Sequence, residues 1–305
     1  MSWFFIALAA PFLWALVNIS DQYLVGRYAV GKRGSGGLVL FSSLVGIFVA
    51  IGIGLFVPHL FSISRLDIFL LLVAGAITAF WVILYLYALE IEEVSSVVPW
   101  FLTIPVFGYG LGYIFLGETL TREQLLGAFI ILIGVFLISI DFSGPKKKIK
   151  WVPAAYMLGA CFLIAVAGVL FKYVTIVGDF WVSSFWEYVG LGISGLFLYI
   201  CIPKYRKEFH LMNQTGGWKI FALNAASEVT TIIGNMLTNY AFLLAPVTMV
   251  YLVSSFQPAI VLFLSIILTE LAPGLIMHED LKERVLLPKV IAIALMIAGS
   301  IILFL

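Results

Sequence analysis

Ten separate runs of mostly apolar residues follow one another along the chain, each about as long as a membrane is thick. A transmembrane helix needs about 20 consecutive apolar residues. Runs of roughly this length occupy residues 2–25, 37–57, 67–89, 94–116, 123–141, 152–174, 180–202, 218–243, 247–268 and 286–305. Because 63% of the residues are hydrophobic and only 11% are charged, the chain could not cover the surface of a soluble protein. The sequence therefore predicts an all-α integral membrane protein with ten transmembrane helices.

The second half of the chain carries a degraded copy of the first half. The matches pair Ala88 with Ala241, Val94 with Val247, Ser95 with Thr248 and Pro105 with Pro258. Five apolar runs precede the basic linker 144–151 and five follow it, so the second set must enter the membrane upside down. This pattern predicts two inverted five-helix repeats, residues 1–143 and 152–305, of the kind from which many transporters are built.

The basic residues are unevenly divided between the two sides of the predicted membrane domain. Of the 17 Lys and Arg residues, only Arg65, Arg122 and Lys172 lie away from the loops that follow the odd-numbered runs. By the positive-inside rule those loops face the cytoplasm. The prediction is a multi-pass protein of the cell (inner or plasma) membrane with both termini and their flanking residues outside the cytoplasm. Because the first run lacks the basic start of a signal peptide, we expect it to be a retained helix.

One face of the run 218–243 is polar. Six polar residues fall within a sector roughly 100° wide at helical spacing; they are Asn224, Glu228, Thr231, Asn235, Thr238 and Asn239. This face must line a cavity or a polar contact between helices, because lipid cannot solvate it. Glu228 lies near the membrane midplane, where a charge costs about 2.5–3.5 kcal/mol, so a partner or water is implied. The alternative is a neutral Glu228 that holds helices together by hydrogen bonds.

Four other runs also present polar or aromatic faces. Aromatic side chains with a few polar groups are typical of a small-molecule cavity. The expected substrate-binding residues are Trp14, Asn18, Trp81, Tyr85, Trp186, Asn224, Thr231, Asn235, Tyr251 and Ser255.

Ionisable residues inside the apolar runs are candidates for proton coupling or charge pairing. They are Glu228, Glu187, Asp21 and Lys172. Burial disfavours the charged form of a carboxyl group, which makes an embedded carboxylate a candidate proton carrier. Glu187 has the alternative of reaching water from a shallow depth, and Asp21 and Lys172 that of snorkelling to the membrane interface. Pro105 and Pro258 occupy matching positions of the two repeats and are candidate gating hinges, with a purely structural bend as the alternative.

Several function classes have no support in the sequence. It contains no nucleotide-binding loop, catalytic triad or metal-ligand spacing, so no enzyme activity, cofactor or metal is predicted. A net charge of +1 predicts no nucleic-acid partner. The expected partners are a small-molecule substrate, the lipid bilayer and, as the candidate coupling ion, the proton. The sequence does not distinguish between a monomer and a homodimer as the oligomeric state.

A turn between the fourth and fifth runs carries a family resemblance. At Gly117-Glu118-x-Leu120-Thr121-x-x-Gln124-x-x-Gly127, with Pro105 before it and Gly134 after it, the sequence resembles the drug/metabolite transporter superfamily in its ten-helix EamA-like branch. Trp14 matches a tryptophan in the first helix of that family. In the second half the motif is broken, because residues 271–284 are inserted after Glu270.

The resemblance implies alternating access around a central cavity lined by helices 1, 3, 4, 6, 8 and 9. Many members of the family have cytoplasmic termini, whereas the charge distribution of this chain predicts the reverse. Substrates in the superfamily range over amino acids, metabolites, nucleotide sugars and drugs, so the fold does not name the substrate.

The sequence thus predicts a secondary transporter, an exporter or exchanger, of a small polar or amphipathic metabolite. The alternative is a non-transporting membrane protein or a lipid-carrier flippase subunit, whose polar helix faces would mediate contacts between helices or with a partner.

Overall fold

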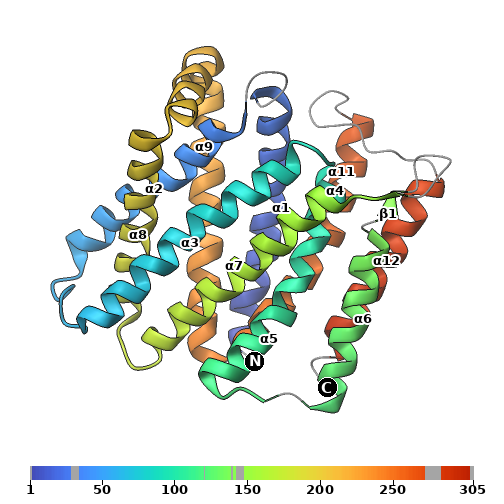
Figure 1. Ribbon diagram of the computed structural model, residues 1–305, viewed down its shortest axis with the longest axis horizontal. Helices are drawn as coiled ribbons and strands as arrows, with labels where there is room; N and C mark the ends of the chain where they lie inside the picture. The colour runs from blue at the N-terminus through green and yellow to red at the C-terminus, as the bar shows by residue number, and fades with distance from the viewer. Residues whose placement is uncertain are drawn as a thin grey trace.

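Helices make up almost all of the first half of the chain. The computed structural model describes residues 2–28, 34–119, 121–138, 140–141, 148–271 and 283–302. In order, the first half contains α1 (Ser2–Tyr28), α2 (Gly36–Phe56), α3 (Arg65–Leu89), α4 (Val94–Val97), the 3-10 helix η1 (Val98–Thr103), α5 (Ile104–Leu116) and α6 (Arg122–Ile138) (Figure 1).

The second half is also helical and begins after a short strand pair. Strands β1 (Ile140–Asp141) and β2 (Lys148–Ile149) pair antiparallel; residues 144–147 of the expected linker lie outside the described residues. The helices that follow are α7 (Trp151–Thr175), α8 (Phe180–Cys201), α9 (Pro203–Leu244), α10 (Val247–Val253), the 3-10 helix η2 (Ser254–Phe256), α11 (Gln257–Leu271) and α12 (Glu283–Ile302).

Eight helical runs of the described chain are long and apolar enough to cross a membrane. They are Trp3–Arg27, Gly36–Phe56, Arg65–Leu89, Val94–Leu116, Trp151–Thr175, Phe180–Cys201, Pro203–Leu244 and Val247–Leu271. Each overlaps one of the apolar runs of the sequence. α6 has 17 residues, and the apolar part of α12, Leu286–Gly299, is shorter still. The length and hydropathy of these helices confirm the predicted class, a multi-pass membrane protein.

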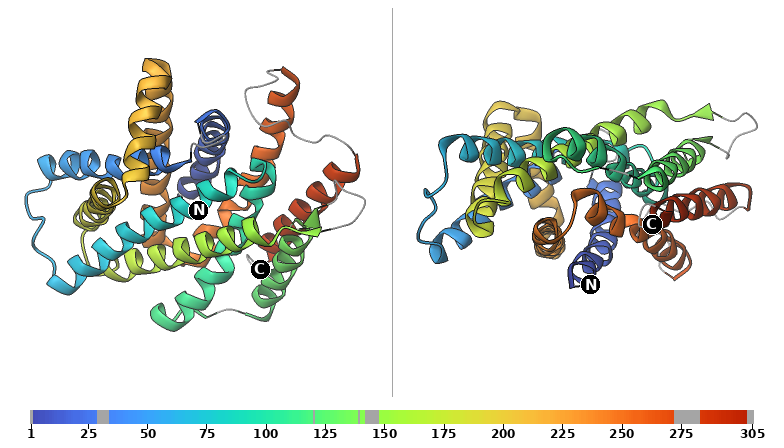
Figure 2. Two further views of the ribbon diagram at one scale, coloured as in Figure 1. Left: turned by 45° about the horizontal axis from the view of Figure 1, so that its top comes forward. Right: turned by 90° about the horizontal axis from the view of Figure 1, so that it is seen from below.

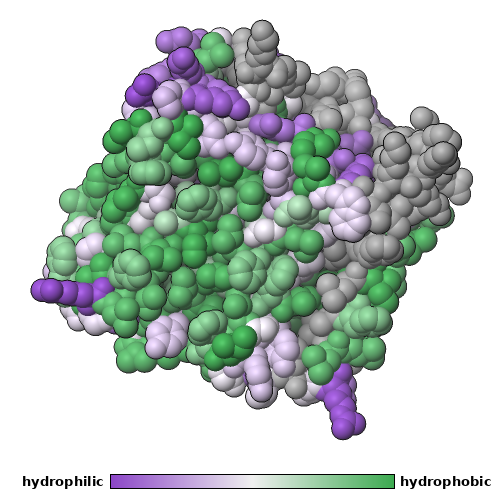
Figure 3. Space-filling view, viewed as in Figure 1, coloured by the Kyte–Doolittle hydropathy of each residue, from purple (hydrophilic) through white to green (hydrophobic). Residues whose placement is uncertain are grey.

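The molecular surface agrees with that class. Large apolar side chains are exposed around the helices, among them Phe48, Phe115, Phe197 and Phe263. Figure 3 shows a broad apolar band across one face and hydrophilic residues gathered at its upper end. An apolar surface of this extent is what a helix bundle presents to lipid.

Helix α9 is longer than the sequence predicts. Its 42 residues include the expected run 218–243 and a preceding stretch whose polar composition favours a loop. The two parts meet at Gly217, whose φ of 63° breaks the helical geometry. The Glu208 carboxylate accepts the backbone N–H groups of Gly34 and Gly36, each at 3.0 Å, at the start of α2. Satisfying these otherwise free donors holds the first part of α9 in place.

Two helical runs of the protein are interrupted in the same way. In each, a short helix passes through a 3-10 segment into a longer helix, as α4–η1–α5 and as α10–η2–α11. Pro105 is the second residue of α5 and Pro258 the second residue of α11. Proline is tolerated in the first turn of a helix because its missing N–H would have no partner there.

The helices surround a common centre. α3 packs against α7 and α8, α1 packs along α9, and α6 pairs with α12 at one side of the molecule; the views of Figure 2 show the same arrangement. α3 and α8 approach very closely, since a Cβ atom added at Gly75 would lie 1.9 Å from the backbone oxygen of Glu187. The close packing of α8 on α3 brings Glu187 toward the centre of the bundle.

Candidate functional site

A cavity lies among the central helices. Its empty space is about 1510 Å³, including the part open to solvent. Side chains from α1, α2, α3, α7, α8, α9 and the α10–η2–α11 run line it, with Phe101 of η1 and Ile104 of α5. Helices from both halves of the chain therefore build one cavity.

The polar face of α9 points into this cavity. All six residues of the predicted stripe line it: Asn224, Glu228, Thr231, Asn235, Thr238 and Asn239. The lipid-exposed residues of the same helix, such as Val229 and Ile233, are apolar. The helix is therefore amphipathic, with its polar side facing the cavity and its apolar side facing outward.

A chain of hydrogen bonds runs along the α1 and α3 walls of the cavity. Gln257 donates from Nε2 to Oδ1 of Asn18 at 2.6 Å, and Asn18 donates from Nδ2 to the Tyr85 hydroxyl at 2.7 Å. The Tyr85 hydroxyl in turn donates to Oδ2 of Asp21 at 3.2 Å. All four side chains line the cavity, so three helical runs are joined by groups that also face its interior.

Glu228 is the most deeply placed carboxylate of α9. It is buried, and it accepts a hydrogen bond from the Ser42 hydroxyl of α2. Ser42 also lines the cavity, and the sequence analysis did not single it out. The signal that marks it is weak, since Ser42 and Ser43 are an isolated polar pair in the apolar run 37–57.

Glu187 faces the cavity from α8. Its Oε2 atom accepts a hydrogen bond from Nδ2 of Asn239 at 2.9 Å, which joins α8 to the polar face of α9. The next residue, Tyr188, also lines the cavity. The Tyr251 hydroxyl donates to the backbone oxygen of Ile164 at 3.0 Å, which fixes the ring against α7.

Most of the residues expected to bind substrate line the cavity. They are Asn224, Thr231 and Asn235 of α9, together with Trp14, Asn18, Trp81, Tyr85 and Tyr251. Trp186 does not line it, because its Nε1 donates to the backbone oxygen of Leu60 at 2.8 Å and its ring packs on Phe61. The side chain of Ser255 lies outside the described residues. Pro105 and Pro258 are buried outside the lining.

Lys172 is held away from the cavity by an ion pair. Its Nζ lies 3.0 Å from Oε1 of Glu118 and donates to the backbone oxygen of Ala245 at 2.8 Å. The sequence offered snorkelling or charge pairing for this lysine, and the structure shows pairing. Glu118 follows Gly117, which ends α5 in the left-handed conformation (φ 68°) that favours glycine.

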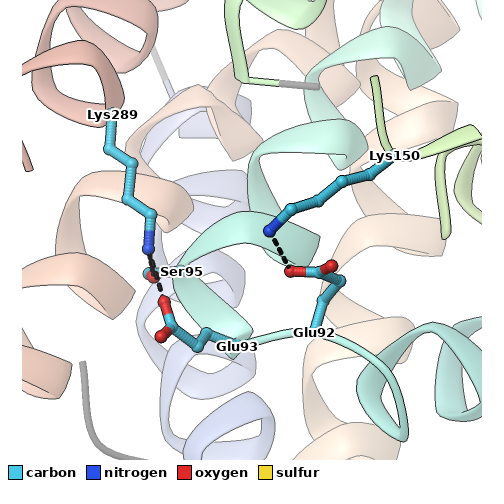
Figure 4. Close-up of polar contacts among 5 residues, drawn as sticks. All are labelled: Glu92, Glu93, Ser95, Lys150 and Lys289. Atoms are coloured by element: carbon cyan, nitrogen blue, oxygen red, sulfur yellow. Dashed lines mark hydrogen bonds and ion pairs between the residues drawn. The ribbon is translucent and has the colours of Figure 1, made fainter. Parts of the chain in front are cut away.

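Two more lysine–glutamate pairs lie at the other end of the α4–η1–α5 run, where α3 ends (Figure 4). Lys150 contacts Glu92 at 2.7 Å, and Lys289 contacts Glu93 at 2.6 Å and the Ser95 hydroxyl at 3.0 Å. These ion pairs hold the start of α7 and the first part of α12 against the turn between α3 and α4.

The described residues include no group of three His, Cys, Asp or Glu side chains placed to hold a metal ion. What the cavity offers is three carboxyl groups, amide and hydroxyl groups, and aromatic faces. Such a lining suits reversible binding of a small molecule.

Comparisons with known proteins give a family and a fold. The family model of the EamA-like transporter family matches residues 1–140. Among solved structures, a protein known from its crystal structure matches over 99% of this chain and 96% of its own, with a TM-score of 0.61 and 17% identity. At that identity the similarity shows the fold alone. A comparison with curated proteins finds no match.

The family match covers the residues that carry the Gly117–Glu118 turn, Trp14, and the α1 and α3 walls of the cavity. Residues 1–140 of this chain are therefore similar to the EamA-like transporter family, a family of membrane transporters in the drug/metabolite transporter superfamily.

Proposed function

We propose that this protein is a secondary transporter of a small polar or amphipathic metabolite, an exporter or exchanger that works by alternating access. The observation that carries the proposal is the polar face of α9, which lines a cavity built by helices of both halves of the chain. Polar and ionisable residues inside a membrane domain are costly and mark the paths of substrates and ions. The match of residues 1–140 to a transporter family supports the same function.

The proposal includes ten transmembrane helices in two inverted repeats, residues 1–143 and 152–305. Two features support the repeats: the residue matches around Pro105 and Pro258, and the shared order of short helix, 3-10 segment and longer helix. α6 and α12, which pack on each other, would be the fifth helix of each repeat. The distribution of Lys and Arg supports extracytoplasmic termini in the cell membrane.

In this proposal Pro105 and Pro258 are the hinges of the two gates. Each lies in the first turn of a helix that directly follows a 3-10 segment, and such a junction has fewer helical hydrogen bonds to restrain bending. The gates would open alternately toward the two sides of the membrane, as rocking of one repeat against the other requires.

Protons are the proposed coupling ion and Glu228 the proposed carrier. The carboxyl group is buried, faces the cavity, and has only the neutral Ser42 hydroxyl as its described hydrogen-bond partner. A carboxyl group so placed can alternate between a protonated state and a charged state that a substrate or water stabilises.

Reconstituted protein tests the function directly. Liposomes with a trapped pH-sensitive dye would be exposed to a panel of amino acids, nucleosides, sugars and amines. We expect at least one compound to drive proton movement above that of protein-free liposomes. Glu228→Gln removes the titrating group at nearly constant volume and should abolish this movement. Glu270→Gln, the same change at an exposed residue of α11, should leave it intact.

Two results would count against the proposal. Normal proton movement in Glu228→Gln would exclude Glu228 as the carrier. If no compound is transported, with or without protons, the non-transporting alternative holds, and the polar face of α9 serves helix or partner contacts, as in a scaffold or a flippase subunit.

A further inference from the structure

The described lining of the cavity contains acidic side chains and no basic ones. Asp21 of α1, Glu187 of α8 and Glu228 of α9 all line it. Among the described residues that line the cavity, there is no Lys, Arg or His. Because all three carboxyl groups line the same cavity, they belong to one site.

Each of these carboxyl groups has a neutral partner. Tyr85 donates to Asp21, Asn239 to Glu187 and Ser42 to Glu228. No ion pair joins any of the three to a basic side chain of the described residues. The carboxylates that pair with lysine all lie outside the cavity: Glu92 with Lys150, Glu93 with Lys289, Glu118 with Lys172 and Glu208 with Lys204.

This contrast has an energetic consequence. A buried carboxylate is stable only when it is paired and hydrogen-bonded, because desolvation penalises an isolated charge. Among the described residues, lysines pair with glutamates at the ends of the bundle and none pairs with the three carboxyl groups in its middle. A counter-charge for these groups can come from protons or from a positively charged ligand.

Two further features of the lining point to an organic ligand. Asn224 is only 3% exposed, lines the cavity, and its Nδ2 has no hydrogen-bond partner. A buried donor without a partner costs free energy that a ligand acceptor can recover. Aromatic rings of Trp14, Trp81, Tyr85 and Tyr251 share the same lining, and such rings attract cations over their faces.

We propose that the substrate is an organic cation, a protonated amine carried on an apolar or aromatic body with one polar acceptor. The amine would be bound by the carboxylates of Asp21, Glu187 and Glu228, the body by the aromatic rings, and the acceptor by Asn224. This substrate class rests on the proposed transport function and refines it, because the same cavity would exclude anions by charge repulsion.

Ligands of matched shape and different charge test the substrate class. The purified protein would be titrated with 1,6-diaminohexane, 6-aminohexanoate and adipate, and with tyramine, tyrosine and 3-(4-hydroxyphenyl)propionate. Each set keeps its apolar or aromatic body and goes from an amine, through a zwitterion that carries both groups, to a carboxylate without an amine. A ligand that binds the folded state raises the melting temperature. We expect the amines to bind at least on the order of tenfold more tightly than the matched carboxylates.

Neutralising the carboxyl groups shows where the amine binds. Asp21→Asn, Glu187→Gln and Glu228→Gln should each reduce the shift produced by the amines, whereas Glu270→Gln should not. If a variant does not fold, the wild-type ligand series still decides the question. Equal shifts within each set, larger shifts with the carboxylates, or no shift with any amine would overturn the proposal.

Uptake of the same radiolabelled compounds into proteoliposomes separates this inference from the function on which it rests. Preferred transport of adipate or 3-(4-hydroxyphenyl)propionate would overturn the cation proposal and leave the transporter intact. Tight amine binding with no uptake of any compound would support the cation site and count against transport.

Discussion

Lys172 and Glu118 form a largely buried ion pair that joins three segments distant in sequence. Besides the lysine, the same Glu118 oxygen accepts the backbone N–H of Val247 at 3.3 Å. The pair therefore fixes α7 and the start of α10 to the turn that follows α5. Side-chain exposures of 9% for Lys172 and 15% for Glu118 show that little water screens the interaction.

Removing one member of this pair should destabilise the protein. In Lys172→Met the Glu118 carboxylate loses its cation and stays largely shielded from water, so we expect the free energy of unfolding to fall by about 3–5 kcal/mol. Thermal unfolding of the protein in detergent would show this as a lower midpoint. The double variant Glu118→Gln/Lys172→Met, which removes both charges, should recover part of the loss. A single variant as stable as wild type would show that the pair contributes nothing.

Neighbouring residues on a helix show which part of the site could be predicted. Trp186 and Glu187 were both expected in the cavity, but adjacent helical residues point about 100° apart. Only Glu187 faces the interior. The polar face of α9 was predictable because six polar residues recur at helical spacing. Ser42 was not predictable, because it belongs to no repeating pattern and its partner Glu228 is 186 residues away in sequence.

The contact between α3 and α8 depends on two glycines that face each other. A Cβ atom at Gly75 would lie 1.9 Å from the Glu187 backbone oxygen, and one at Gly190 would lie 2.3 Å from that of Leu72. Small residues allow helices to approach closely in lipid, where packing rather than hydrophobic burial drives association. Because the contact includes the Glu187 backbone, it also sets the depth of that side chain in the cavity.

Filling this contact should separate the two helices. Gly75→Ala places a methyl group against backbone that cannot rotate away, so we expect a loss of about 1–3 kcal/mol in stability. A lower thermal midpoint of the purified protein would report it. Gly110→Ala is the matched control, because a Cβ atom there meets nothing within 4 Å. Equal midpoints for the two variants would mean that α3 and α8 are not so tightly packed.

Element boundaries were predictable where hydropathy alone sets them. The eight helices that can span a membrane overlap apolar runs visible in the sequence. The first part of α9 was missed because Lys204, Arg206 and Lys207 give it the composition of a loop. Its helix depends on the contacts of Glu208 with the start of α2, which are tertiary contacts and leave no local pattern.

Over the whole molecule, charge is arranged differently at the ends and in the middle. Lysine–glutamate pairs join helices at both ends of the α4–η1–α5 run, whereas the carboxyl groups in the cavity have neutral partners. In the described part of the chain, ion pairs hold the bundle at its ends, and the carboxyl groups at its centre have no basic partner. The sequence predicted the membrane class and the polar face of α9, but the pairing of each charge required the folded structure.

Thiol labelling of one cavity position from both sides of the membrane tests alternating access most directly. Asn235→Cys would be made in a Cys201→Ser background, because Cys201 is exposed whereas Cys161 is buried. A membrane-impermeant thiol reagent would then be added to right-side-out and to inside-out vesicles. Ile233→Cys, on the outward face of the same helix and 48% exposed in the absence of lipid, is the matched control. We predict that Asn235→Cys reacts from both sides and Ile233→Cys from neither. Reaction of Asn235→Cys from neither side, or from one side only, would contradict a transporter that opens its central cavity to each side in turn.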